Sequence, residues 1–201
     1  MTLVVRDALV LWDADGERTG ELRLDDGSEV VSTLDASGCV VTPGLVNAHH
    51  HLLQSGFRTL PGTRGVPMAQ WLPTMAAAYA AAGIAPELVA ATAAVGVTEG
   101  LLCGVTTVAD HHLNWPHDAS VETTVDIARA IADTAREIGS RLVYVRGSAR
   151  DDAAWAGASA DAIATALVPH GGVSDDGMLQ VAVGPAGGPR RRAQTTLCVG
   201  P

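Results

Sequence analysis

Three consecutive histidines, His49, His50 and His51, close a short apolar segment of the 201-residue chain. Successive side chains of a β-strand point to opposite faces, so His49 and His51 share one face and His50 lies on the other. Neutral imidazole nitrogen is a favoured ligand of zinc and neighbouring divalent metals. The spacing therefore predicts a metal site made by His49 and His51. The alternative is a polar loop triplet that binds nothing.

A second group of polar residues closes the apolar segment VTTVAD, which ends at Asp110 and is followed by His111 and His112. If this segment is a strand, one of the two histidines faces inward. That imidazole would hydrogen-bond substrate or orient a metal ligand. A role in tying the following loop is an equal alternative.

Four further side chains are candidates for the wall of a pocket. Gln54 and Arg58 follow His51 closely, and in a helical turn both would face the mouth of the site, where their donors suit a ring carbonyl or nitrogen. A surface ion pair explains Arg58 equally well. The indole of Trp71 would wall the pocket, although a core position is the more ordinary role of a helical tryptophan. Arg146 either reaches the pocket or pairs with a nearby aspartate.

The elements that must position these residues alternate along the chain from Gly44 onward. Four apolar segments lack the polar alternation of a half-exposed sheet, which predicts parallel strands covered by helices and laid side by side in chain order. These segments are 44–49, 105–110, 141–148 and 179–184. The expected helices are 67–82, 86–103, the segment between a Ser120 cap and Gly139, and 159–168.

The predicted fold class is α/β: the first half, about four β/α units, of a TIM-like (β/α)8 barrel, preceded by a small N-terminal β-sandwich portion. A closed barrel typically takes about 250 residues, more than this chain offers. The expected domains are a partial β-sandwich at 1–43, an incomplete barrel at 44–185 and an irregular tail at 186–201. The tail loses all periodicity, which indicates a shifted reading frame or a truncation, with a disordered native terminus as the alternative.

Composition argues against several classes of protein. The 13 basic residues are all arginine, so chemistry that needs a lysine has no residue here. The net charge of −9 argues against a nucleic-acid partner. Three scattered cysteines argue against a disulfide framework. We expect a cytoplasmic protein without a membrane partner, because neither a signal peptide nor an apolar run of roughly 20 residues is recognisable.

The strand that ends in the histidine triplet resembles the entry to the catalytic barrel of the amidohydrolase superfamily, in which an apolar strand and Pro-Gly precede His-x-His; the stretch is VVTPGLVNAHHHLLQSGFR. A narrower resemblance, to the branch of cytosine and adenosine deaminases and atrazine-type chlorohydrolases, is carried by ELVAATAAVGVTEGLLCGVTTVADHH and REIGSRLVYVRGS. The triplet, Gln54 and Asp110-His111-His112 look most like the 8-oxoguanine deaminase group.

The resemblance implies hydrolysis of a non-peptide C–N bond in a cyclic amidine or purine-like ring by metal-activated water. It assigns one divalent ion, zinc or alternatively iron, to His49 and His51. The resemblance favours a substrate role for Gln54. Trp71, His111 and His112 are the further candidate substrate contacts.

The family's other ligands, two histidines and an aspartate on later strands, have no counterpart here, so no catalytic residue is assigned. The expected partner is a small heterocyclic substrate. The open edges of the sheet predict one of three outcomes: self-association into a homo-oligomer, aggregation, or dependence on the rest of the enzyme. The alternative functions are an inactive truncated remnant and a non-catalytic metal-binding module.

Overall fold

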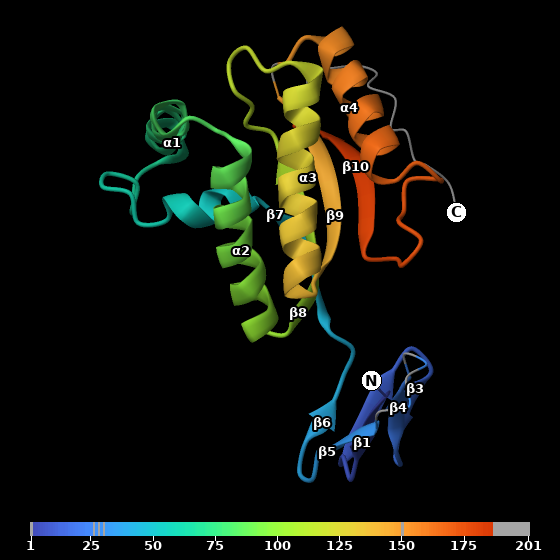
Figure 1. Ribbon diagram of the computed structural model, residues 1–201. Helices are drawn as coiled ribbons and strands as arrows, with labels where there is room; N and C mark the ends of the chain where they lie inside the picture. Colours follow the sequence, from blue (N-terminus) through green and yellow to red (C-terminus); the bar gives the residue numbers. More distant parts are fainter. Residues whose placement is uncertain (1, 26, 28, 30, 150, 187–201) are drawn as a thin grey trace. The chain divides into compact units, whose positions relative to one another are not determined.

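The computed structural model describes residues 2–25, 27, 29, 31–149 and 151–186 (Figure 1). The chain divides into two compact units, Met1–Gly44 and Leu45–Pro201. Apart from its first residue, the irregular tail expected at 186–201 lies outside the described residues. Among the described residues, no helix combines the length and apolar character needed to cross a bilayer.

The described part of the first unit forms two three-stranded sheets, each with an antiparallel and a parallel pair. One sheet has the order β4 (Leu22–Leu24), β1 (Thr2–Arg6), β5 (Val31–Asp35). The other has the order β3 (Gly16–Arg18), β2 (Val10–Asp13), β6 (Val40–Val41). Gly16 and Gly27 adopt positive φ, a conformation in which glycine meets no steric penalty.

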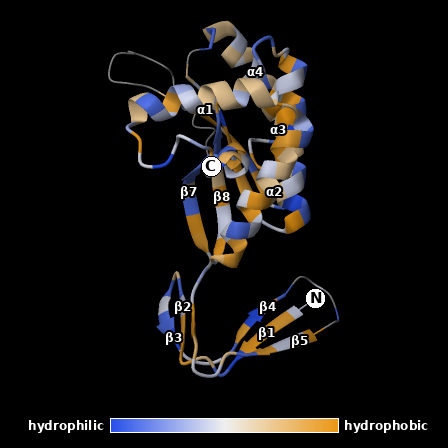
Figure 2. Ribbon diagram, turned by 90° about the vertical axis from the view of Figure 1, so that its left-hand side faces the viewer, coloured by the Kyte–Doolittle hydropathy of each residue, from blue (hydrophilic) through white to orange (hydrophobic). Residues whose placement is uncertain are grey.

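A four-stranded parallel sheet with the order β10-β9-β8-β7 is the centre of the second unit. Its strands are β7 (Leu45–His50), β8 (Val105–His112), β9 (Arg141–Ser148) and β10 (Leu179–Pro185). The parallel pairing in chain order confirms the interpretation of the four apolar segments. The carboxyl ends of the strands therefore meet at one edge, and Figure 2 shows β7 changing from hydrophobic at its start to hydrophilic at its end.

Helices cover one face of this sheet (Figure 1). The helical segments are η1 (Leu52–Phe57), α1 (Met68–Ala82), α2 (Pro86–Leu102), α3 (Val121–Ile138) and α4 (Ala153–Leu167). The Ser120 hydroxyl accepts the N–H of Thr123 at 3.1 Å, and Gly139 ends α3 in the left-handed conformation, as the sequence predicts. Helix α4 begins well before the expected residue 159, because Asp152 accepts the N–H of Trp155 and caps it.

The core of the second unit lies between the sheet and its helices. It is made mainly of apolar side chains, among them Val108, Ile127, Ile131, Leu142 and Ile163. Burial alternates along β8, where Val108, Asp110 and His112 are buried and the residues between them are partly exposed. This alternation places Asp110 and His112 on the helix-covered face and His111 on the other.

Candidate metal site at the carboxyl end of the sheet

The imidazoles of His49 and His51 lie together where β7 ends. Their ring centroids are 5.0 Å apart and their planes are inclined at 86°. Two imidazoles bound tetrahedrally to one zinc ion, with Zn–N distances of about 2.0–2.1 Å, have centroids about 5 Å apart. The separation of the two rings is thus the one expected for imidazoles that share a single divalent cation. The neighbouring His50 also borders a separate cavity of about 210 Å³ beside α2, and burial lowers the pKa of its ring.

Hydrogen bonds from nearby residues orient this pair. The pairing of β7 with β8 is irregular between Asn47 and His50, and there the Asn47 side-chain oxygen accepts the N–H of His49 at 3.2 Å. The Nδ1 atom of His51 lies 2.6 Å from the carbonyl oxygen of His111. A carbonyl only accepts, so Nδ1 of His51 carries the proton. Its Nε2 lone pair is thereby left for a cation, as is usual for metal-binding histidines.

Asp110 binds the turn that follows His51. Its Oδ1 atom accepts the backbone N–H of Leu52 at 2.7 Å, and both residues are fully buried. Burial raises the pKa of the Asp110 carboxyl to about 7, and the hydrogen bond from Leu52 opposes that shift. One end of β8 is thus joined to the first residue of η1.

The two histidines at the end of β8 lie in different surroundings. The ring centroid of His111 is 4.2 Å from that of His49, and burial together with His49 lowers the pKa of His111. His112 is buried on the helix side, with its ring 4.7 Å from Trp115 and 6.2 Å from Tyr144, and burial lowers its pKa to about 4. The rings of His49, His51 and His111 therefore form one imidazole cluster. His112 lies on the opposite face of the sheet, away from this cluster.

A cavity of about 430 Å³ adjoins the histidines. Its lining includes His49, His51, Gln54, Arg58 and Trp71, so the structure brings Gln54 and Trp71 to the predicted pocket. Arg58 is engaged at this wall, because its guanidinium pairs with Glu99 of α2 and donates to Ser55. Arg58 thus lines the cavity, as predicted, and also forms the ion pair that was its alternative role.

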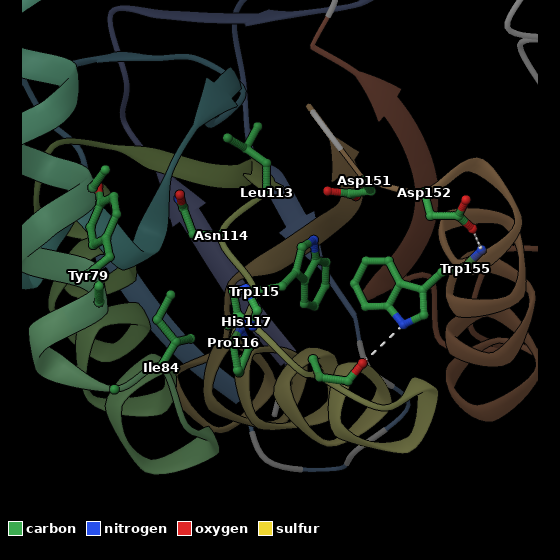
Figure 3. A pocket seen from close by; sticks show the side chains of 14 residues that line it. Tyr79, Ile84, Leu113, Asn114, Trp115, Pro116, His117, Asp151, Asp152 and Trp155 are labelled. Carbon is green, nitrogen blue, oxygen red and sulfur yellow. Dashed lines mark hydrogen bonds between the residues drawn. The ribbon is translucent and has the colours of Figure 1, made fainter.

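A larger cavity of about 790 Å³ lies among α1, the loop after β8 and the start of α4 (Figure 3). Sequence reasoning assigned nothing to its two indoles, Trp115 and Trp155, which meet edge to face at 6.1 Å. The Arg146 guanidinium lies over both rings, at 5.0 and 4.8 Å from their centroids, and pairs with Asp151 at 2.6 Å. Arg146 is thus an ion-pair partner rather than a lining residue.

Within the described part of the chain, no group of three or more His, Cys, Asp or Glu side chains is arranged to hold a metal ion. A catalytic zinc ion usually has three protein ligands and one open position. His49 and His51 alone therefore make a partial ligand set. Their geometry suits a cation, and further donors would have to come from elsewhere.

The second unit has a parallel sheet covered by helices, and its imidazoles and the adjoining cavity lie at the carboxyl ends of the strands. Enzymes with a (β/α) barrel place their active sites in this position. Comparison with family models gives the particular family. Residues 40–191 match the amidohydrolase family, and the chain belongs to that family.

Individual relatives agree with this assignment. The chain is 33% identical to 8-oxoguanine deaminase of Pseudomonas aeruginosa over 158 residues, 72% of this chain and 34% of that protein. It is 32% identical over 173 residues to 5-methylthioadenosine/S-adenosylhomocysteine deaminase of Natronomonas pharaonis, 84% of this chain and 39% of that protein. The crystal structure of atrazine chlorohydrolase from Arthrobacter aurescens TC1 complexed with zinc matches with a TM-score of 0.72 and 26% identity, over 93% of this chain and 47% of the other. The chain therefore spans between about a third and a half of the length of these relatives.

Proposed function

We propose that this chain supplies part of the active site of a metal-dependent hydrolase that deaminates a purine-like or other cyclic amidine ring. The observation that carries the proposal is the His49–His51 pair, with ring centroids 5.0 Å apart, beside a cavity of about 430 Å³ at the carboxyl end of the sheet. The similarity to 8-oxoguanine deaminase and to 5-methylthioadenosine/S-adenosylhomocysteine deaminase supports a ring substrate.

His49 and His51 would hold one divalent cation, zinc or alternatively iron. When bound, such a cation lowers the pKa of water and so supplies the nucleophile for attack on a ring carbon. The chain's own contribution is to hold both imidazoles at the same end of β7, with the proton of His51 kept on Nδ1 by the carbonyl of His111. The absence of lysine from the sequence favours a site with a single metal over one in which a lysine bridges two.

Gln54 and Trp71 would bind the ring. The Gln54 amide offers both a donor and an acceptor, which suits the adjacent carbonyl and nitrogen atoms of a heterocycle. The Trp71 indole offers a flat apolar surface on the same cavity. His111 lies beside His49, and its lowered pKa keeps it neutral near pH 7, so it would exchange a hydrogen bond with substrate without adding charge.

A second function, metal binding without turnover, is favoured by one observation: the described residues contain no group of three ligating side chains. In this case His49 and His51 would hold a cation in a non-catalytic module. Cytoplasmic localisation and self-association stay predictions under either function.

One experiment separates the two functions. Binding of 8-oxoguanine and 5-methylthioadenosine to the zinc-loaded chain is measured by isothermal titration, alongside ammonia release, for wild type and for the His51→Ala and Gln54→Ala variants. Ring binding that requires His51 and is weakened by Gln54→Ala supports the hydrolase site. Stoichiometric zinc without ring binding supports the binding module, and the absence of zinc binding rejects the proposal.

A further inference from the structure

We infer that Asp110 is a positioning residue for His51 and acts through the backbone of the turn that follows it. The inference rests on the proposed binding of a cation by His49 and His51. The Oδ1 atom of Asp110 accepts the N–H of Leu52 at 2.7 Å. Leu52 directly follows His51 and is the first residue of η1.

Consecutive residues of β8 hold consecutive residues of this turn. Asp110 binds the backbone of Leu52 through its side chain, and His111 binds the ring of His51 through its carbonyl, at 2.6 Å. The first bond fixes where the turn lies, and the second fixes the rotation and tautomer of the imidazole. The second bond forms only if the turn stays in place, so the orientation of the His51 ring depends on Asp110.

The carboxylate takes the place of a missing helix cap. The first N–H groups of a helix have no partner within the helix, and His51, which precedes η1, provides no side-chain cap. Asp110 supplies the acceptor from a strand 58 residues away in the sequence. Leu52 and Asp110 are both 0% exposed, so water is not available to replace this bond.

The test combines a tautomer measurement with a zinc titration, each on the 201-residue chain. Nitrogen-15 NMR of the imidazoles, recorded without metal, reports whether the proton of His51 is held on Nδ1. Zinc affinity is measured by isothermal titration. The variants are Asp110→Ala, which removes the acceptor, and Asp110→Asn, which keeps an amide oxygen at the same place. Thr124→Ala is the matched control, because Thr124 is fully buried and hydrogen-bonded but lies on α3, bonded to Val121 and Ser159.

In Asp110→Ala we expect mixed His51 tautomers and a zinc affinity weaker by about 10–100-fold, the usual effect of losing an outer-shell partner. Asp110→Asn should restore the Nδ1–H tautomer and most of the affinity, and Thr124→Ala should change neither. Should Asp110→Ala fail to fold, Asp110→Ser is measured in the same way, because the serine side chain is too short to reach the N–H of Leu52.

An Asp110→Ala chain that folds and keeps both the wild-type tautomer and the wild-type affinity overturns the inference. Equal losses in Asp110→Ala and Thr124→Ala also overturn it, because they would reflect general destabilisation. If the wild-type chain binds no zinc, the proposed function fails. The metal-free tautomer of His51 still decides the positioning role, so the two failures are distinguishable.

Discussion

Replacement of Arg146 by methionine is expected to lower the free energy of unfolding by about 3–5 kcal/mol, the usual cost of breaking a buried ion pair on one side. The Arg146 and Asp151 side chains are 1% and 14% exposed, so little water reaches the carboxylate that would be left behind. The guanidinium also donates to the Ser159 hydroxyl at 3.2 Å and the Gly147 carbonyl at 2.9 Å.

The two indoles add to this cost. Arg146 lies 5.0 Å from the Trp115 centroid and 4.8 Å from that of Trp155, and each cation–π contact contributes about 0.5–2 kcal/mol. The cost of burying the guanidinium away from water offsets part of the stabilisation from the ion pair and the two cation–π contacts. The expected loss in the free energy of unfolding therefore stays at about 3–5 kcal/mol, the value typical of a broken buried pair. For a chain of this size, 1 kcal/mol shifts the melting temperature by about 2–4 °C, so a fall of roughly 6–20 °C is expected.

A double-mutant cycle measured by urea unfolding tests the reasoning. Arg146→Met leaves the Asp151 carboxylate without its partner, whereas Arg146→Met combined with Asp151→Asn removes that charge as well. The double variant should therefore be more stable than the sum of the two single losses predicts. Strict additivity, or an Arg146→Met loss below about 1 kcal/mol as for an exposed pair, would refute the claim of a buried, coupled pair.

Two further predictions concern packing and pH. An added Cβ at Gly96 of α2 would lie 2.6 Å from the Ser55 hydroxyl oxygen, so Gly96→Ala is expected to cost about 1–3 kcal/mol. An added Cβ at Gly157 of α4 would meet no atom within 4 Å, so Gly157→Ala should raise the free energy of unfolding by about 0.5–1 kcal/mol, because alanine favours a helix over glycine. Equal effects of the two substitutions in urea unfolding would contradict this packing. Burial lowers the pKa of His112 to about 4, so between pH 6.5 and 4 the unfolded chain takes up a proton that the folded chain does not, and stability falls as pH falls. The free energy of unfolding of wild type, measured relative to His112→Gln, should drop by about 3 kcal/mol across that window. The comparison cancels the effect of Asp110, whose raised pKa stabilises the folded chain as pH falls in both proteins. A difference independent of pH would show that His112 is not buried in neutral form.

Local signals in the sequence were enough for most elements of the second unit. Continuous apolar segments gave the parallel strands and their order, and Ser120 and Gly139 marked the ends of α3. The start of α4 was missed, because a capping aspartate followed by an alanine-rich segment is a weak signal beside the clearer pattern further along. The strand order could be predicted because short right-handed crossovers leave few alternatives.

The contents of the site depend on contacts between distant residues, which is why sequence reasoning stopped short of them. Alternation along a strand shows that His111 and His112 face opposite ways, but which one faces the imidazole cluster depends on which face the helices cover. The hydrogen bond from Leu52 to Asp110 and the contacts of Arg146 with the Trp115 and Trp155 rings likewise join elements far apart in the chain. No local pattern of residues carries such pairings.

The most direct test of the central claim is an isothermal titration of zinc into the wild-type chain and its three single histidine variants in the triplet. We predict one ion per chain for wild type and for His50→Ala, and loss of that binding in both His49→Ala and His51→Ala. Wild-type affinity in His49→Ala or His51→Ala, or a loss confined to His50→Ala, would contradict the claim that His49 and His51 together bind one cation.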